Sequence, residues 1–241
     1  MIKKISLMLS IGFFITACQA EPCNCPQQPV TPPPAEAPNT AAAEATPTAE
    51  APAPAQKVSQ TPIAVGEAEI SLPKPLPVKA TLTQCLQDRR SIRSYTDQMI
   101  SLEQLSALLW SGNGINREDG KRTAPSARNL QSVSLFVAFE KATYRYDHVA
   151  HKLIRVAEGD LRPVKAAPVE LIVTSSFADN EVIQGIDSGV VSQNIALYCA
   201  AEGLATVIRM MRGDQSELQK SLGIEPTNRP LFNMAVGYEA K

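Results

Sequence analysis

The residues with the clearest chemical potential in this chain of 241 residues form two short clusters. The first is Arg89-Arg90-Ser91-Ile92-Arg93, in which three guanidinium groups and a hydroxyl stand close together. Because a guanidinium offers paired donors that match phosphate oxygens, this cluster could hold a phosphate. The second cluster, residues 123–131, reads TAPSARNLQ, and a proline-serine loop that opens a helix there would contact a polar ligand. Taken alone, each cluster is also compatible with an ordinary solvated or capped helix end.

Other common catalytic patterns are absent from the sequence. It contains neither a Gly-x-x-x-x-Gly-Lys phosphate loop nor a Gly-x-Gly-x-x-Gly dinucleotide motif. The two histidines, His148 and His151, fall in an expected hairpin turn without a third metal ligand nearby, and we expect them to be solvated. No nucleophile-elbow motif supports a Ser-His-Asp triad. Cys85 and Cys199 lie in helical patterns and are expected to pack in the core.

The elements that would position these clusters mix helices and strands. Thr81-x-x-Gln84 and Ser101-x-x-Gln104 resemble capping boxes, which predicts helices from about 81 to 88 and from 101 to the glycines at 112 and 114. A long helix is expected over 181–202, where Gly203 stops it, and a short one between Asp214 and Gly223. Strands are expected over 133–139, 143–147, 152–157, 169–175, 204–209 and 231–237. Since these elements lack a regular βαβ alternation, the sequence predicts an α+β fold.

Together and in this order, the two clusters resemble one family. Arg-Arg-Ser-x-Arg-x-Tyr at 89–95, followed by Pro-Ser-x-x-Asn-x-Gln at 125–131, is similar to the nitroreductase family of FMN-dependent oxidoreductases. Residues 186–194 resemble its long central helix, 201–206 its Gly-Leu-x-Thr strand beside the flavin, and 236–238 its terminal Gly-Tyr. The resemblance covers about residues 80–238 and implies a central mixed or antiparallel sheet flanked by helices.

A finer resemblance points to one branch of that family. Residues 113–123, which read NGINREDGKRT, are closest to the thiazoline-dehydrogenase (SagB-type) branch, and so is the hairpin segment Tyr144–Asp147.

The resemblance implies a role for each residue of the first cluster. Arg89, Arg90 and Ser91 would hold the phosphate and ribityl chain of FMN. Arg93 would reach toward the pyrimidine edge of the flavin, where positive charge stabilises the anionic reduced form. Many relatives also carry a basic C-terminal tail that reaches the phosphate, a contact that here falls to Lys241 or is absent.

The resemblance also implies that the site is shared by two subunits. Pro125, Ser126 and Asn129 would contact the flavin of the other subunit, so the active species would be a homodimer. The small residues Ser188, Gly189 and Ser192 of the long helix permit close helix packing, either across that dimer or beneath their own sheet.

A strand segment would contribute its backbone next to the reactive flavin atom. Main-chain groups around Ile208, Arg209 and Met210 would lie against the ring near N5, where hydride arrives and leaves. The Arg209 side chain would add positive charge at the ring or point away. No catalytic side chain is assigned, because the flavin carries the chemistry. The substrate would be an unidentified small molecule, and the alternative is a non-catalytic module of the same fold that binds flavin or another ligand.

The N-terminus is typical of an export signal. Lys3 and Lys4 precede an apolar run, and Ile15-Thr16-Ala17-Cys18 resembles a bacterial lipobox. This implies that residues 1–17 are removed and that Cys18 is lipidated; the alternative is a plain signal peptide with an incidental cysteine. Gln19 after the cysteine implies outer-membrane localisation in a Gram-negative envelope.

Residues 18–77 are rich in proline and alanine, and such a segment buries too little apolar surface to fold on its own. We expect a semi-stiff linker there and a folded domain over 78–241; a peptidoglycan- or partner-binding segment is the alternative. Cys23-Asn24-Cys25 falls short of a zinc site because it lacks further ligands. The net charge of −1 argues against nucleic acid as a partner. No interior stretch reaches the ~20 apolar residues that span a bilayer.

Overall fold

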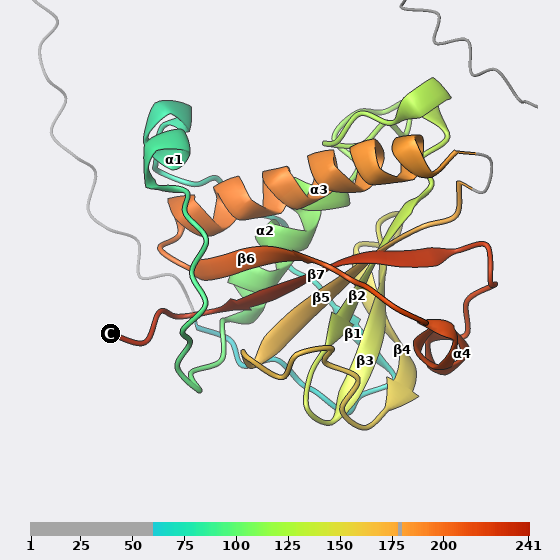
Figure 1. Ribbon diagram of the computed structural model, residues 1–241. Helices are drawn as coiled ribbons and strands as arrows, with labels where there is room; N and C mark the ends of the chain where they lie inside the picture. The colour runs from blue at the N-terminus through green and yellow to red at the C-terminus, as the bar shows by residue number, and fades with distance from the viewer. Residues whose placement is uncertain (1–59, 178–179) are drawn as a thin grey trace, which may run out of the picture. The chain divides into compact units, whose positions relative to one another are not determined.

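The computed structural model describes residues 60–177 and 180–241 (Figure 1). The expected signal peptide, Cys18 and the linker up to residue 59 lie outside these residues. Within the described ranges, no helix has the length and apolarity needed to cross a membrane.

A single antiparallel sheet forms the centre of the domain. Seven strands of the described part follow the spatial order β1-β4-β3-β2-β5-β7-β6, and every neighbouring pair is antiparallel. The strands are β1 (Glu69–Ser71), β2 (Val133–Ala138), β3 (Ala142–Asp147), β4 (Lys152–Glu158), β5 (Val169–Ser175), β6 (Ala205–Met210) and β7 (Arg229–Gly237). Strand β6 therefore lies at one edge of the sheet, with only β7 beside it.

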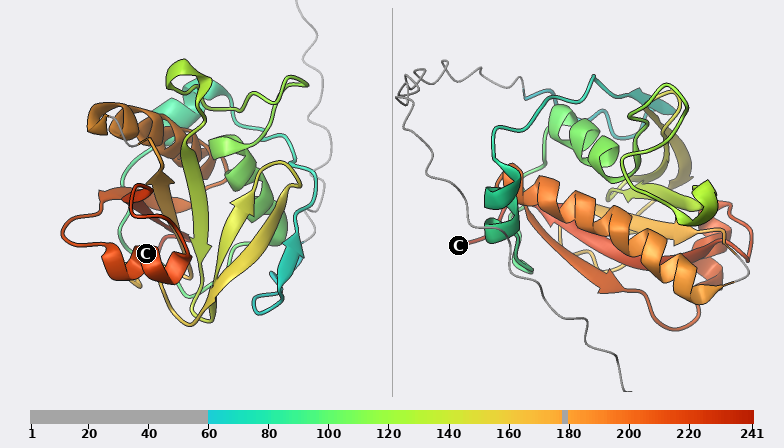
Figure 2. Two further views of the ribbon diagram at one scale, coloured as in Figure 1. Left: turned by 90° about the vertical axis from the view of Figure 1, so that its right-hand side faces the viewer. Right: turned by 90° about the horizontal axis from the view of Figure 1, so that it is seen from above.

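Helices cover both faces of this sheet, so the predicted α+β class is confirmed. One face carries α1 (Leu82–Asp88), α2 (Leu102–Asn113) and the long α3 (Glu181–Ala201), and α3 lies in front of the sheet in the right-hand view of Figure 2. The main core fills the space between them. The short α4 (Ser216–Leu222) packs through Leu222 against Phe136 and Ile172 on the opposite face.

The local signals in the sequence place the helices well. Ser101 caps α2 as predicted, since its side chain accepts from the N–H of Gln104 while Gln104 caps it in return. Helices α2 and α3 cross closely at Gly112, where an added Cβ would lie 2.6 Å from Cγ1 of Ile195. This close crossing fixes where α3 lies on the sheet.

Ordered structure starts earlier than the predicted domain boundary at Val78. Residues 69–71 form β1, which pairs with β4, and Ile70 is buried in the core. The backbone N–H of Leu72 donates to the carbonyl of His151 at 3.2 Å. The average composition of residues 18–77 does not reveal this strand. A strand of three residues buries only one side chain and depends on the edge of a neighbouring strand.

The expected helix after the Pro-Ser loop is wrong. Only a single 3-10 turn, Ala127–Asn129, forms there. Arg128, Asn129 and Gln131 have φ values of 52°, 55° and 50°, and a residue with positive φ cannot continue a right-handed helix.

Candidate functional site

The first arginine cluster follows the end of α1 and runs along the free edge of β6. The N–H of Ile92 donates to the carbonyl of Thr206 at 2.9 Å. The hydroxyl of Tyr95 donates to the carbonyl of Ile92 at 2.6 Å, which closes the segment into a compact loop. Residues 89–95 and strand β6, more than 100 residues apart in the sequence, are therefore neighbours, as the resemblance requires of a common site.

The C-terminal segment borders the same loop. The N–H of Thr96 donates to the carbonyl of Tyr238 at 2.9 Å, and the N–H of Ala240 donates to that of Ser94 at 3.2 Å. Lys241 follows directly, so its main chain lies next to this loop. An ion pair of 2.6 Å joins Arg90 to Glu239.

The remaining polar side chains of the cluster are available to a ligand. Arg89, Ser91 and Arg93 make no side-chain hydrogen bond or ion pair with any residue in the described ranges. Ser91 and Arg93 are exposed and Arg89 is half-buried. Two unpaired guanidinium groups and a hydroxyl fit the donor set that an anionic phosphate needs.

Beyond Thr206, strand β6 turns main-chain groups to the same edge that have no partner among the described residues. Successive residues of an antiparallel strand direct their N–H and C=O alternately to the two sides. Since the carbonyl of Thr206 points outward to Ile92, the main-chain groups of Ile208 and Met210 also face the free edge. Ile208 is 38% exposed and Met210 is 64% exposed. This edge can therefore hydrogen-bond the polar rim of a planar ligand.

Arg209 differs from its two neighbours. Its main chain faces β7, where it is paired with Asn233. Because opposed residues of an antiparallel pair share a face, its side chain lies with Asn233 on the α4 side of the sheet. The Arg209 guanidinium therefore points away from the face that α3 covers.

The Pro-Ser segment is anchored to α3 at a different place. The N–H of Ala127 donates to both carboxylate oxygens of Asp187, at 3.1 and 3.2 Å. The hydroxyl of Ser126 accepts from the N–H of Gln131 at 3.0 Å. Asp187 is 4% exposed, and the anchored turn leaves Asn129 exposed. Sequence reasoning missed Asp187, although an acidic residue inside an otherwise small and apolar helical stretch was a usable signal.

The two clusters lie toward opposite ends of α3 within one subunit (Figure 1). Helix α1 packs at the C-terminal end of α3, where Leu82 and Ala201 line one groove. The Pro-Ser segment is held at Asp187, which is 14 residues earlier and so about 21 Å away along the helix axis. The chain folds the first cluster onto β6 but does not bring the Pro-Ser segment to it.

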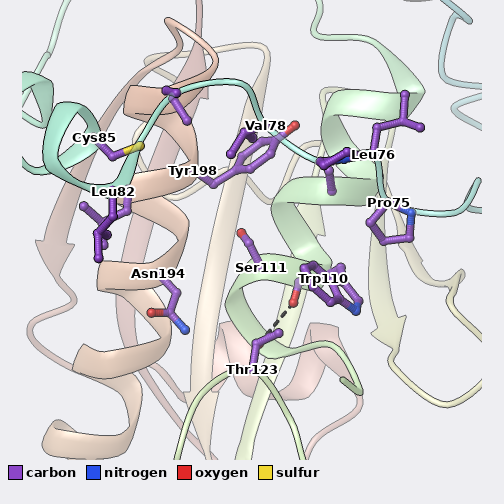
Figure 3. A pocket seen from close by; sticks show the side chains of 15 residues that line it. Pro75, Leu76, Val78, Leu82, Cys85, Trp110, Ser111, Thr123, Asn194 and Tyr198 are labelled. Atoms are coloured by element: carbon purple, nitrogen blue, oxygen red, sulfur yellow. Dashed lines mark hydrogen bonds between the residues drawn. The ribbon is translucent and has the colours of Figure 1, made fainter. Parts of the chain in front are cut away.

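A groove of about 590 Å³ separates α1, α2 and α3 from the segment 75–80 that crosses above them (Figure 3). Leu82, Trp110 and Tyr198 are among the residues that line it, and none of the described residues that line it is charged. Leu76 and Leu82 remain 53% and 66% exposed.

Comparison with known proteins identifies the fold. The model of the nitroreductase family matches residues 86–238, which is most of the described domain. This chain belongs to the nitroreductase family. A protein of Methanocaldococcus jannaschii named as a nitroreductase is 27% identical over 194 residues, covering 70% of this chain and 96% of that protein. The FMN reductase [NAD(P)H] of Bacillus subtilis is 30% identical over 177 residues, and the match covers 64% of either chain.

A solved structure from Ralstonia eutropha JMP134, also described as a nitroreductase, has a TM-score of 0.68 to this nitroreductase at 28% identity. It covers 76% of this chain, and 94% of its own length is matched. A second structure, from Anabaena variabilis ATCC 29413, has a TM-score of 0.58 at 19% identity and supports the fold alone.

The histidines of this nitroreductase are half-buried and hydrogen-bonded to protein groups, whereas the sequence led us to expect solvated side chains. Nδ1 of His151 lies 2.9 Å from the Tyr146 hydroxyl, and its Nε2 lies 2.8 Å from the Ser106 hydroxyl. Nε2 of His148 accepts from Arg122 at 2.9 Å. Burial lowers the pKa of both imidazoles. The hairpin packs its turn against α2, and no spacing rule in the sequence reports that packing. In the ranges described, no cluster of three metal-ligating side chains occurs.

The small residues of α3 divide between its two sides. Ser188 and Ser192 are fully buried against their own sheet, and Ser192 donates to the carbonyl of Ser188 at 2.8 Å. Gly189 instead faces open space, and its neighbour Ile186 is 58% exposed. Close approach of another helix is therefore possible at Gly189 and not at the two serines. Cys85 and Cys199 are buried, as predicted.

Proposed function

We propose that this nitroreductase is an FMN-dependent oxidoreductase that acts as a homodimer. Each flavin is held between the Arg89–Arg93 segment of one subunit and the Pro125–Gln131 segment of the other. The observation that carries the proposal is that the Pro-Ser segment is anchored at Asp187, about 21 Å along α3 from Ala201 and the start of α1, whereas the arginine segment follows α1 onto β6. One ligand can meet both only where two subunits join.

The residues present fit FMN. Arg89 and Ser91 offer unpaired donors for its phosphate, and Arg93 adds a cation for the pyrimidine edge. The outward main-chain groups of Ile208 and Met210 can hydrogen-bond the rim of the ring. When bound, FMN supplies the hydride chemistry, and the protein supplies orientation and charge. The name of the Bacillus subtilis relative, an FMN reductase, supports the same cofactor.

Arg90 has a modified role in this proposal. Its ion pair with Glu239 ties the arginine cluster to the C-terminal segment. Arg90 and Lys241 then contribute positive charge near the phosphate, while Arg89 makes the direct contact. The Arg209 side chain is left out of the flavin contacts because it lies on the other face of the sheet.

Two-fold symmetry accounts for the shared site. In a two-fold interface the same surface patch of each subunit meets its copy. If the outer faces of the two α3 helices pack antiparallel, the Asp187 end of one helix meets the α1 end of the other. Val182 and Ile186, 68% and 58% exposed, and the open Gly189 supply that outer face.

The cellular setting rests on the sequence of residues 1–77. We propose an envelope lipoprotein anchored through Cys18, in the outer membrane if the cell is Gram-negative, with the Pro/Ala-rich segment as its tether. Several acyl chains on one cysteine give stable anchoring. Replacing Cys18 by Ser releases the protein from membranes or leaves it unprocessed; mature C18S protein that stays membrane-bound contradicts this anchor.

Within the family, we place the chain nearest the thiazoline-dehydrogenase (SagB-type) branch, on residues 113–123 and Tyr144–Asp147. The substrate is a small molecule. Because nicotinamide cofactors are scarce outside the cytoplasm, we expect the electrons to be exchanged with another component of the envelope.

Titration of the purified protein with FMN tests the phosphate contact. Hydrogen bonds to charged groups contribute about 1.5–3 kcal/mol, so R89A should weaken FMN binding roughly tenfold or more. The exposed Arg117 lies outside the cluster, and R117A is the matched control. Equal affinity of R89A and R117A, with both proteins folded, removes Arg89 from the site.

Mixing two variants, each with one flavin contact removed, tests whether the FMN site is shared between the subunits. R89A and N129A homodimers each lack one contact at both sites. A mixed dimer regains one site with both contacts and keeps one with neither. After subunit exchange, FMN occupancy should rise toward half of the sites in each mixed dimer. If mass spectrometry confirms exchange and occupancy stays at the parental level, the site is not shared.

A further inference from the structure

A second cavity lies on the face of the sheet opposite α3. Its volume is about 480 Å³. The end of β6, helix α4 and the loop 160–164 enclose it, with Leu161, Met211 and Leu218 as apolar walls. The sheet separates it from α3 and from the Pro-Ser segment, and of the proposed flavin contacts only Met210 is among the described residues that line it.

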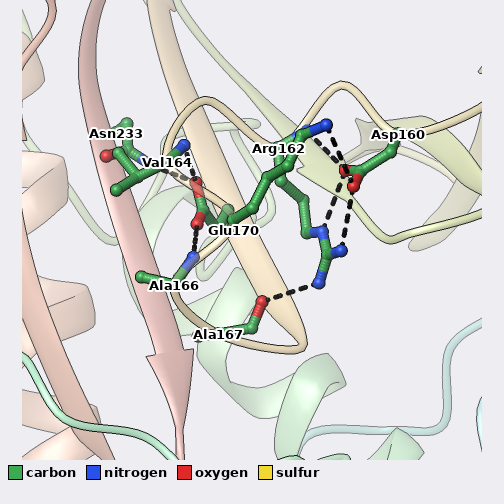
Figure 4. A network of polar contacts seen from close by, with 8 residues as sticks. Asp160, Arg162, Val164, Ala166, Ala167, Glu170 and Asn233 are labelled. Carbon is green, nitrogen blue, oxygen red and sulfur yellow. Dashed lines mark hydrogen bonds and ion pairs between the residues drawn. The ribbon is translucent and has the colours of Figure 1, made fainter.

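A buried carboxylate holds the loop that borders the cavity (Figure 4). Glu170 is fully buried and accepts from the N–H groups of Val164 and Ala166 at 3.0 and 2.8 Å, and from Nδ2 of Asn233 at 2.7 Å. These bonds fix the loop after residue 160. The bond to Nδ2 also fixes the orientation of the Asn233 amide, because turning it over would set its oxygen against the carboxylate.

Two buried polar atoms among the residues that line this cavity lack a partner. Asn233 is 1% exposed, and its Oδ1 makes no hydrogen bond in the described part of the chain. Nη1 of Arg209, opposite Asn233 on the neighbouring strand, is likewise buried without a partner. Buried polar groups in native proteins are nearly always satisfied, so a missing partner points to something that binds there.

The charges around the cavity indicate the chemical class of ligand that would satisfy these two atoms. Asp160 and Arg162 neutralise each other through two contacts of 2.9 Å, and Arg162 also donates to the carbonyl of Ala167. Of the other charged side chains in the lining, Arg209 and Arg212 are cationic and Glu217 is anionic. The unpaired guanidinium of Arg209 calls for an anion, whereas Oδ1 of Asn233 can only accept and calls for an O–H or N–H donor.

We propose that this cavity binds a small organic acid that carries a hydroxyl or amine group beside its carboxylate. The carboxylate pairs with Arg209, the neighbouring hydroxyl or amine donates to Asn233, and the apolar body lies against Met211 and Leu218. A volume of several hundred Å³ with apolar walls and a few fixed polar groups is typical of a ligand site.

A matched pair of acids tests the proposal by calorimetric titration of the purified full-length protein. Mandelate has a carboxylate, a neighbouring hydroxyl and an apolar ring, and phenylacetate lacks only the hydroxyl. We expect one mandelate site per subunit and at least tenfold weaker binding of phenylacetate, because a buried acceptor left without its donor is costly.

Two variants and a control locate the binding. R209M should weaken mandelate at least tenfold, and N233L should abolish the preference for mandelate over phenylacetate. R117M, which removes an exposed arginine elsewhere, should bind like the parent. The flavin absorbance of R209M, recorded in parallel, distinguishes loss of this site from loss of the flavin.

Three results overturn the proposal: no saturable binding of either acid, equal affinity for the two acids, or mandelate binding that R209M leaves unchanged. The ligand pair tests the role of Asn233 in the unaltered protein, so the conclusion stands even if N233L does not fold. Ordered water alone at the two unpartnered atoms corresponds to the first result.

Discussion

Glu170 is a buried carboxyl group whose hydrogen bonds within the described residues all come from neutral N–H groups. It is fully buried in β5, and its two oxygens receive three hydrogen bonds, from Val164, Ala166 and Asn233. We predict that Glu170→Gln, which keeps the shape and removes the acceptor character of one oxygen, destabilises the domain. The amide nitrogen of the new side chain must face at least one N–H group that formerly donated to oxygen.

The magnitude follows from the contacts. If the amide nitrogen takes the place of Oε1, only the bond from Ala166 is lost, and a hydrogen bond to a charged acceptor contributes about 1.5–3 kcal/mol. A buried N–H of the new amide that stays unsatisfied adds about 1–3 kcal/mol. Partial exposure of Ala166 lets water offset part of this loss. We therefore expect a decrease of about 2–4 kcal/mol in the free energy of unfolding, or roughly 5–15 °C in Tm for a domain of this size.

Urea unfolding of the parent, E170Q and E118Q measures this decrease. Glu118 is exposed in the segment 114–123, so E118Q is a matched charge-removing control that should change stability by less than about 0.5 kcal/mol. The reasoning is refuted if E170Q is as stable as E118Q. Such a result would mean that the three N–H groups find other acceptors.

The remaining predictions concern packing and protonation. Gly112→Ala should cost about 1–3 kcal/mol, measured by urea unfolding, because the new methyl lies 2.6 Å from Ile195 unless α2 and α3 move apart; an unchanged stability refutes the close crossing. The hydrogen bond and charge of Arg162 lower the pKa of Asp160 to about 2, below its ordinary 3.8. The pair should thus contribute about 1–2 kcal/mol above pH 4–5 and lose it as the pH falls from about 4 to 2, so the Tm difference between the parent and D160N should vanish near pH 2. Burial lowers the pKa of His151 below its ordinary 6.5, so NMR should find a titration midpoint below 6.5 in the folded protein, and a midpoint at or above 6.5 contradicts this effect of burial.

The sequence by itself determined the features that depend on a few neighbouring residues. The capping pattern at Ser101 placed α2, and the apolar run at 169–175 placed β5 at its observed bounds. The order of the motifs from Arg89 to Tyr238 identified the family, which the family comparison confirms over 86–238. These signals are local, because caps, periodicity and turn residues act within one or two turns of chain.

The tertiary structure decided what depends on distant partners. Strand β1 exists because β4 offers it an edge, and three residues alone carry too weak a pattern to predict it. The burial of His151 depends on a hydroxyl from α2, and the pairing of Arg90 depends on Glu239 near the other end of the chain. The spacing of neighbouring residues in the sequence predicts none of these contacts.

In the candidate flavin site, too, some features follow from the local sequence and others only from the tertiary structure. The residue types at 89–93 and 125–131 pointed to an anionic ligand because guanidinium and hydroxyl groups bind anions wherever they stand. Which way Arg209 points, and how far the Pro-Ser segment lies from the arginine cluster, depends on strand register and on the length of α3 between their anchors. Register and helix length set directions and distances in space, and therefore only the folded chain reveals that one subunit does not bring the two clusters together.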